Sequence, residues 1–131
     1  MEAVNAVGLK FKTAKAGVDI PFGKTEVVLT APISEEYKNL NDYSAAVKIK
    51  LGNTSFLLTR DVERTWEMEM VASQQDLDVN LLLIPHHGSN SSSTQEFLDK
   101  TTHSYVIISS GRDNNYGHPH KEVLQRLVKI I

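Results

Sequence analysis

The chain has 131 residues, of which 40% are hydrophobic and 23% are charged, and its formal net charge is −2. This length fits one modest domain with its own hydrophobic core. The small net charge gives no global electrostatic case for nucleic-acid binding, although a local basic patch stays open. Because cysteine is absent, disulfides and thiolate metal sites are excluded. Any metal would need histidine, carboxylate or other oxygen ligands.

The ends of the sequence predict a piece of a longer polypeptide. "LQRLVKII" stops inside an apolar helical pattern, without the glycine or proline that usually closes a helix. A small domain with frayed ends is the alternative. No apolar window approaches the length of a membrane helix, and the N-terminus has no apolar signal-peptide core.

The first part of the chain is predicted to contribute strands. Residues 7–12 alternate apolar and polar side chains, which suggests a short strand. A second strand is expected in "TEVVLTAP", where Pro32 ends it. The polar residues 33–42 that follow are predicted to form a loop.

Residues 43–59 are predicted to form a hairpin. Apolar and polar side chains alternate in its first arm, and Gly52-Asn53 suits a two-residue turn that favours positive φ. The second arm, residues 54–59, is more uniformly apolar. That pattern predicts a strand buried on both faces.

Helical spacing follows the hairpin. Val62, Trp66 and Met70 repeat every four residues, which predicts an amphipathic helix from near Asp61 to Ser73. A short apolar strand is expected next, in "DVNLLLIP". The segment that carries the helix therefore lies between two strands.

The last part of the chain repeats this alternation. Ser93 and Glu96 form a capping box that predicts a helix start. "SYVIISS" is predicted to be another buried strand, and Pro119 precedes a final helix with Val123 and Leu127 in its apolar stripe. The whole order predicts an α/β architecture in which helices flank a layered sheet.

Polar side chains follow three of the predicted strands. They are Asp61 after the first, His86 and His87 after the second, and Asn115, Tyr116, His118 and His120 after the third. Ligands gather at the carboxyl ends of strands in layered α/β folds. If the three strands are neighbours, a carboxylate and several imidazoles converge on one rim of the sheet.

These residue types suit metal-assisted hydrolysis. A neutral imidazole and an aspartate oxygen are ligands for zinc, iron or manganese, and a hydrolytic site keeps an open position for water. A bound metal lowers the pKa of that water towards neutrality. His118 or His120 could supply a hydrogen-bond donor or a proton at the leaving oxygen.

Each of these residues also has a simpler interpretation. Aspartate at the start of a helix is more often an N-cap than a ligand, although Asp61 could be both. His118, before Pro119, could be a helix-entry residue with no chemical role. We expect His103 to be exposed between a helix and a strand. The serine run at residues 89–94 favours a flexible loop, because it lacks the glycines and lysine of a phosphate loop.

Three stretches of the sequence resemble a known family. They are "NDYSAAVKIKLGNTSFLLTRDVE", "LLLIPHHGSNSSSTQEF" and "NNYGHPHKEVLQRL", which cover most of the chain from Asn41 onward. They resemble the later half of the metallo-β-lactamase-fold domain of ComEC-type DNA-internalisation competence proteins and of related secreted hydrolases. The resemblance implies a single partial domain, residues 1–131, that is the later half of an αββα sandwich. Residues 1–40 would be a strand-rich lead-in, and residues 41–131 would carry the motifs.

The resemblance also implies roles for individual residues. Asp61 and His86 would be metal ligands, with His87 second choice to His86, and zinc or manganese would be the metal. The other site residues are grouped by role: His118, His87, Asn115 and Tyr116 as catalytic or cleft residues, and Asn41, Ser44, Arg60 and His120 as substrate-lining residues.

Two departures from the family pattern matter. The family's main metal motif, His-x-His-x-Asp-His, does not occur, since all five histidines lie at or after position 86. The resemblance therefore implies a missing N-terminal half of the domain and an incomplete metal site. Arg60 stands where relatives usually have glycine before the aspartate, and it could either disfavour metal or contact phosphate.

The leading functional hypothesis is a fragment of a metal-dependent hydrolase that acts on DNA or another phosphodiester during DNA uptake. The isolated chain is expected to be inactive, and its parent to be an extracytoplasmic or membrane-associated bacterial protein. The alternative is a non-catalytic DNA-binding or scaffolding module in which Arg60, Lys121 and Arg126 contact phosphates. A fragment that only associates with its missing half is a third interpretation, which the fold does not exclude.

Overall fold

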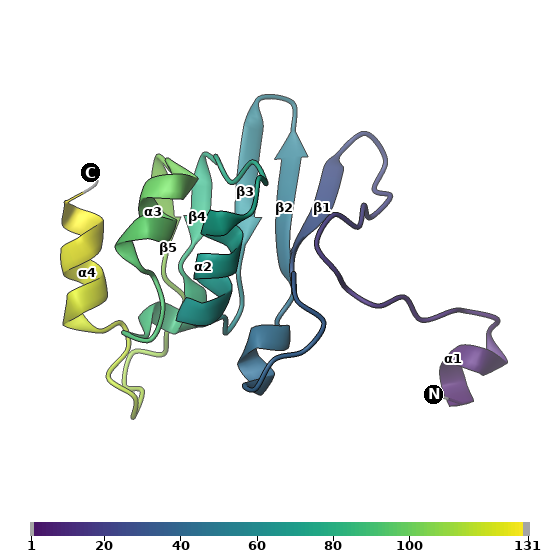
Figure 1. Ribbon diagram of the computed structural model, residues 1–131, viewed down its shortest axis with the longest axis horizontal. Coiled ribbons are helices and arrows are strands. Elements are labelled where there is room, and N and C mark those ends of the chain that lie inside the picture. Colours follow the sequence, from purple (N-terminus) through teal and green to yellow (C-terminus); the bar gives the residue numbers. More distant parts are fainter. Residues whose placement is uncertain (1, 130–131) are drawn as a thin grey trace.

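The computed structural model describes residues 2–129 and contains one five-stranded sheet with helices packed on it (Figure 1). The strands are β1 (Glu26–Ala31), β2 (Ala46–Leu51), β3 (Thr54–Leu58), β4 (Leu81–Leu83) and β5 (Tyr105–Ile107). The helices are α1 (Glu2–Ala6), α2 (Arg64–Ala72), α3 (Gln95–Thr101) and α4 (Lys121–Val128), with short 3₁₀ turns η1 (Leu40–Tyr43) and η2 (Pro85–Gly88). The α/β layered architecture expected from the sequence is confirmed.

The strands lie in the order β1-β2-β3-β4-β5. The first three are antiparallel neighbours, and the predicted hairpin forms β2 and β3, with Gly52 at φ 59° in its turn. β4 and β5 continue the sheet parallel to β3. Because parallel strands end at the same edge, the loops that follow β3, β4 and β5 leave the sheet together.

The helices α2, α3 and α4 bury one common core against the sheet. Trp66 of α2 lies beside Phe97 of α3, with ring centroids 6.4 Å apart, and both are fully buried. Leu57 and Leu82 supply the sheet side of this core, and α4 adds its buried stripe. No helix in the described part of the chain has the length and apolar character needed to cross a membrane.

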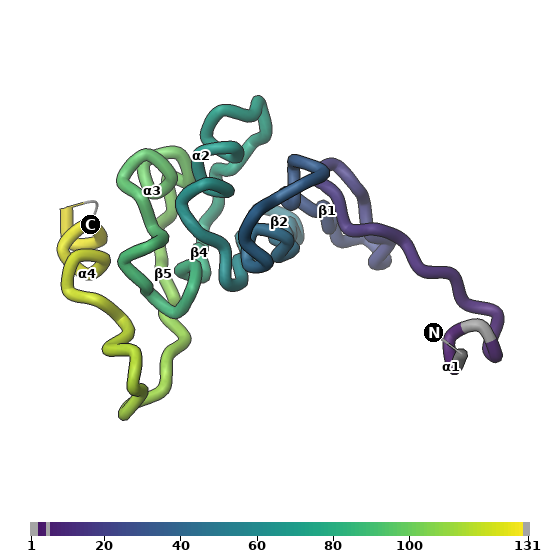
Figure 2. Tube along the Cα trace, turned by 60° about the horizontal axis from the view of Figure 1, so that its bottom comes forward, coloured from purple at the N-terminus to yellow at the C-terminus, as the bar shows by residue number. Residues whose placement is uncertain are grey.

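The N-terminal arm departs from the sequence prediction. Residues 7–12 form no strand, and Val7, Leu9 and Phe11 are exposed on an extended segment that leads to α1, away from the sheet (Figures 1 and 2). Alternation of side chains can stabilise a strand only where a partner strand supplies hydrogen bonds and an apolar surface. This arm has neither, so the predicted strand was wrong.

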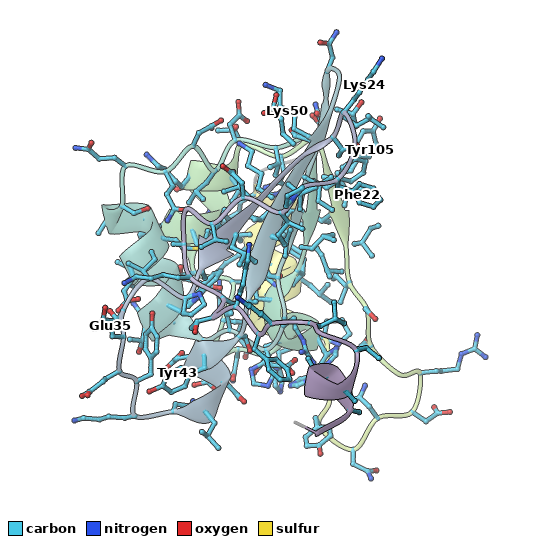
Figure 3. All side chains as sticks on the ribbon, turned by 90° about the vertical axis from the view of Figure 1, so that its right-hand side faces the viewer. Phe22, Lys24, Glu35, Tyr43, Lys50 and Tyr105 are labelled. Atoms are coloured by element: carbon cyan, nitrogen blue, oxygen red, sulfur yellow. The ribbon has the colours of Figure 1, made fainter. Side chains whose placement is uncertain are left out.

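Within residues 2–129, no helix covers the second face of the sheet. Two apolar rows cross it from strand to strand: Val27, Ile49, Phe56, Leu81 and Tyr105 in one, and Leu29, Val47, Leu58, Leu83 and Ile107 in the other. Tyr105 is 70% exposed and Ile107 49% exposed. Figure 3 shows Tyr105 and Phe22 on the side of the sheet away from α2. The predictions that β3 is buried on both faces and that β5 is a buried strand are therefore wrong.

Three local predictions also need correction. α2 begins at Arg64 with Glu63 as its N-cap residue, so Asp61 is not the cap and lies in the preceding loop. α3 is capped by Thr94, whose hydroxyl accepts from the Phe97 N–H, and not by Ser93. His103 is buried at 9% exposure rather than exposed.

Candidate metal and phosphodiester site

The turn that follows β4 holds two histidines in an unusual backbone conformation. His86 and His87 have φ of 48° and 56°, the left-handed region that non-glycine residues seldom occupy. Strained residues of this kind persist only where the surroundings hold them, and they cluster at functional sites. Here the His86 N–H donates to the Arg60 carbonyl at 2.9 Å, and the Ser92 hydroxyl donates to the Pro85 carbonyl at 3.1 Å. Both flanking loops therefore fix the turn.

Gly88 allows the loops after β4 and β5 to meet. A Cβ atom on Gly88 would lie 2.7 Å from the Pro119 Cβ, and the Gly88 φ of +81° also favours glycine. The His120 N–H donates to the Gly88 carbonyl at 2.9 Å. This close contact places the ring of His118 beside the histidines of the β4 turn.

The histidines form one cluster with an aspartate at the rim of the sheet. The His118 ring centroid is 5.8 Å from that of His86 and 6.4 Å from that of His87. Asp61 follows β3, and its Oδ1 is 3.4 Å from His87 Nε2. The convergence expected from the sequence thus occurs, at the end of the sheet from which the β5–α4 loop hangs in Figure 1.

Two small hollows open at this cluster. One of about 280 Å³ is lined by the cluster together with Asn41 and Tyr116. The other, about 240 Å³, lies towards the strand ends and includes Arg60. Tyr116 stacks on His118 with ring centroids 5.7 Å apart. The rim therefore combines aromatic, acidic and imidazole groups around open space.

His87 has the orientation of a metal-binding histidine. Its Nδ1 is 2.6 Å from the Ser109 carbonyl, so Nδ1 carries a hydrogen and donates it. Nε2 then faces Asp61, the usual arrangement in which one ring nitrogen is fixed by a carbonyl and the other is free for a metal. The 3.4 Å between His87 Nε2 and Asp61 Oδ1 brings one nitrogen and one oxygen donor close enough to share a ligand.

His86 has a different environment. Its Nδ1 lies 3.8 Å from Glu63 Oε1 and 3.5 Å from the Ser91 hydroxyl. Glu63 also accepts from Asn39 Nδ2 at 2.8 Å and from Asn41 Nδ2 at 3.4 Å. Where the resemblance put His86 first and His87 second, the geometry places His87 beside Asp61.

The donor set of this chain does not fit a complete metal site. Within residues 2–129, no group of three or more histidine, aspartate or glutamate side chains is arranged to hold a metal. Asp61 and His87 supply two donors, and a hydrolytic zinc site uses three protein ligands. A complete hydrolytic zinc site at this position would need at least one further protein ligand besides these two.

Three of the predicted site residues, Asn115, Ser44 and His120, do not line these two hollows. Asn115 is exposed and Ser44 is the C-cap of η1, and neither lines the cluster. Asn114 has the structural part instead, since its Oδ1 accepts from the His118 N–H and its Nδ2 donates to the His118 carbonyl. His120 is the N-cap residue of α4, and its Nδ1 accepts from the Asn90 N–H at 3.0 Å.

A buried glutamate that the sequence pattern did not single out holds residues 89–94, the serine loop. Glu67 is fully buried, and its carboxylate accepts from the N–H groups of Ser93 at 2.5 Å and Thr94 at 2.8 Å. Burial raises the pKa of Glu67, and those two hydrogen bonds oppose the rise. On the other side of the loop, Arg126 donates to the Ser92 carbonyl at 3.0 Å and to that of Ser93. The predicted flexible loop is therefore tied from both sides.

The pKa of His118 is lowered by partial burial, and then by the neighbouring rings of His120, His86 and His87. The neutral form is thus favoured near pH 7. A neutral imidazole has one N–H donor and one acceptor nitrogen. His118 can therefore donate a hydrogen bond to an oxygen bound in the hollow without adding charge.

Fold and site together define an α/β chain in which histidine and aspartate side chains line one rim of the sheet. No family model matches the sequence. The chain is 28% identical over 127 residues to ComE operon protein 3 of Bacillus subtilis. The aligned region covers 97% of this chain and 16% of that protein.

Two further relatives point the same way. Competence protein ComA of Neisseria gonorrhoeae is 34% identical over 95 residues, covering 70% of this chain and 14% of that protein. Recombination protein 2 of Haemophilus influenzae is 36% identical over 87 residues, covering 66% of this chain and 11% of that protein. The chain is therefore related to competence proteins, of which it spans less than a fifth of the length. The metallo-β-lactamase fold stays a prediction.

Proposed function

We propose that this chain is the later half of a metal-dependent phosphodiesterase domain that acts on DNA in connection with DNA uptake. The convergence of Asp61, His87 and His118 on one hollow carries the proposal. The relationship to competence proteins supports DNA as the substrate. The competence link and the hydrolytic chemistry have independent support, because one comes from relatives and the other from the residues of the site.

In this proposal each residue has a limited role. Asp61 and His87 are the two metal ligands of this chain, and His118 donates its ring N–H to a phosphate oxygen. Tyr116 and Asn41 border the bound DNA beside these residues. Zinc or manganese, once its other ligands are in place, would supply an activated water and neutralise charge on the phosphate.

The remaining ligands would come from a preceding half of the same domain. The uncovered face of the sheet supports this partner, because soluble chains seldom leave so large an apolar surface in water. A second sheet packing face to face about 10 Å away would bury both apolar rows. The parent would be a membrane-associated or extracytoplasmic bacterial protein.

A second candidate function is a non-catalytic DNA-binding or scaffolding module. The incomplete ligand set of residues 2–129 and the presence of Arg60 beside Asp61 favour it. Arg126 contributes less than expected to this interpretation, because the carbonyls of Ser92 and Ser93 occupy its Nη1. Salt-sensitive binding to single-stranded DNA with no hydrolysis by the parent would support this module.

Metal titration of this chain by calorimetry tests the ligand assignment. Manganese or zinc is expected to bind weakly, and Asp61→Ala or His87→Ala is expected to abolish that binding. Asp113→Asn, an exposed acid in the loop after β5, is the matched control and should change nothing. Tight stoichiometric binding that survives both alanine substitutions contradicts the assignment.

Hydrolysis is tested on the longer polypeptide that contains this chain. With manganese, it is expected to cleave single-stranded DNA, and Asp61→Asn and His87→Asn should each lower kcat/KM by about 100-fold or more. Asp113→Asn should keep full activity. Equal cleavage by all variants would rule out the proposed site, and absence of cleavage by the unaltered protein would favour the binding module.

A further inference from the structure

A third hollow, larger than the two already described, lies beside the histidine cluster. Its volume is about 580 Å³, and it is formed where the start of α2 faces the serine loop and α4. The residues that matter for its chemistry are Arg64, Thr65, Asn90, Ser91, Gln95 and Arg126. The proposed phosphodiesterase mechanism uses none of them.

Only a thin wall separates this hollow from the histidine cluster. Ser91 lines the hollow, and its hydroxyl is 3.5 Å from His86 Nδ1. Asn90 lines it too, and its N–H donates to His120 Nδ1. Glu63 belongs to both places, since it borders the hollow and lies 3.8 Å from His86. A polymer bound at the cluster could therefore continue directly into this space.

The two arginines of the hollow differ in availability. Arg126 is fixed, because its Nη1 donates to the Ser92 and Ser93 carbonyls. Arg64 is exposed, and its side chain makes no hydrogen bond or ion pair with residues 2–129. Its guanidinium can therefore bind an external phosphate, with the hydroxyls of Thr65 and Ser91 as further donors.

The hollow is polar but not simply basic. Glu63 and Glu96 line it together with the two arginines, so its formal charge balances. The Glu63 carboxylate is already occupied by Asn39, Asn41 and His86. The side-chain amides of Asn90 and Gln95 offer both donors and acceptors. Such a mixture suits a nucleotide, which has an anionic phosphate and a base with both kinds of group, better than a bare anion.

We propose that this hollow binds the nucleotide adjacent to the scissile phosphodiester of a single-stranded DNA, with Arg64 on its phosphate. This subsite rests on the proposed function, because it extends the same strand from the histidine cluster. The subsite adds a DNA-binding residue, Arg64, on the first turn of α2 and therefore outside the loops that follow the β-strands. It also gives the serine loop a role as the floor between two consecutive nucleotides.

Binding by this 131-residue chain, without metal, tests the subsite. Fluorescence anisotropy with a labelled oligodeoxythymidylate of about eight nucleotides measures the Kd and its salt dependence. Arg64→Gln is expected to raise the Kd by about tenfold and to reduce the salt slope by about one. Arg64→Lys should restore part of the affinity, since it keeps the charge and loses the planar fork. Lys100→Gln, an exposed cation in the last turn of α3, should change the Kd by less than about twofold.

Competition with inorganic polyphosphate separates a nucleotide site from a polyanion site. The proposal expects polyphosphate of equal charge to bind more weakly than the oligonucleotide. Equal affinity with the same dependence on Arg64 would overturn the nucleotide assignment, and an unchanged Kd for Arg64→Gln would overturn the subsite itself. Cleavage by the longer polypeptide with an unaltered KM in Arg64→Gln rejects the subsite alone. Arg64-dependent binding without any cleavage rejects the proposed hydrolysis alone.

Discussion

Both faces of the sheet carry apolar side chains over β3, β4 and β5, yet the surroundings of these side chains are opposite. On one face, Leu57 and Leu82 are fully buried beneath α2 and α3. On the other, residues of the same strands face solvent, and Leu58 is 37% exposed. The covered face can stabilise the chain by burial at roughly 25 cal/mol per Å² of apolar surface, whereas the uncovered face gains this only with a partner. The site loops lie on the edge between the two faces.

Substitutions on the two faces should therefore show the largest difference in their effect on the free energy of unfolding. Trp66→Ala removes a fully buried side chain and is expected to cost about 3–5 kcal/mol of unfolding free energy. Tyr105→Ser and Ile107→Ser remove exposed side chains and should cost within about 0.5 kcal/mol. Urea denaturation of each variant followed by circular dichroism measures the difference.

The same pair of variants sharpens the comparison. Tyr105→Ser and Ile107→Ser are expected to weaken association with the preceding half of the domain, since they remove apolar area from the contact. A large loss of stability in this chain alone would show that the uncovered face already packs against something within it. That result would remove the main support for a second sheet.

The site edge should be nearly as sensitive as the covered face. Gly88→Ala combines left-handed backbone strain of about 1–2 kcal/mol with overpacking against Pro119 of about 1–3 kcal/mol. The substitution should destabilise the chain and shift the NMR signals of His118 and His120. Gly23→Ala, at a φ of 59° in open space, is the control that carries the strain without the contact. Equal effects of both substitutions would mean that the contact with Pro119 contributes nothing.

A substitution of Glu67, which links the helix-covered core to the serine loop, should have a smaller effect on stability. Glu67→Gln keeps the shape of the side chain but replaces a charged acceptor by an amide, at an expected cost of about 1–3 kcal/mol. The Ser93 and Thr94 N–H groups should then exchange faster with deuterium, because they lose the carboxylate. Glu96→Gln, an exposed residue in the first turn of α3, is the matched control. Unchanged exchange at both amides would contradict the proposed anchoring of the serine loop.

The sequence predicted the sheet and the convergence of the rim, because both depend on local patterns. Alternation and turn residues identified β2 and β3, and polar residues directly after apolar strands identified Asp61 and the histidine pair. Parallel strands then bring such ends together regardless of the details. Periodicity could not show that β3 and β5 have an uncovered face, since an apolar run reads the same whether or not a partner is present.

The finer organisation of the site depends on contacts between distant residues. Nothing local distinguishes His87 from His86, and only the Ser109 carbonyl fixes which ring faces Asp61. In the sequence, Glu67 occupies an ordinary charged position of an amphipathic helix, and only the fold brings the N–H groups of the serine loop to its carboxylate. Arg60 could be noticed in the sequence, but its position in the 240 Å³ hollow comes from the fold.

The smallest expected effect is a dependence of stability on pH. Burial lowers the pKa of His103 below the usual value of 6.5, and its Nε2 is buried without a partner in the described part of the chain. A lowered histidine pKa means that the unfolded chain binds more protons than the folded chain as pH falls below about 6.5. Stability should therefore be full above that pH and decline below it. His118, whose pKa is lowered as well, should add to the decline.

Thermal unfolding between about pH 7.5 and pH 5 measures this loss in the unaltered chain and in His103→Gln and His118→Gln. Each substitution should flatten the fall in Tm, and the buried His103 should account for more of it than the rim residue His118. A fall of Tm that both variants retain in full would assign the pH dependence to other groups. A larger contribution from His118 would mean that the surroundings of His118 at the rim disfavour its protonated form more strongly than burial disfavours that of His103.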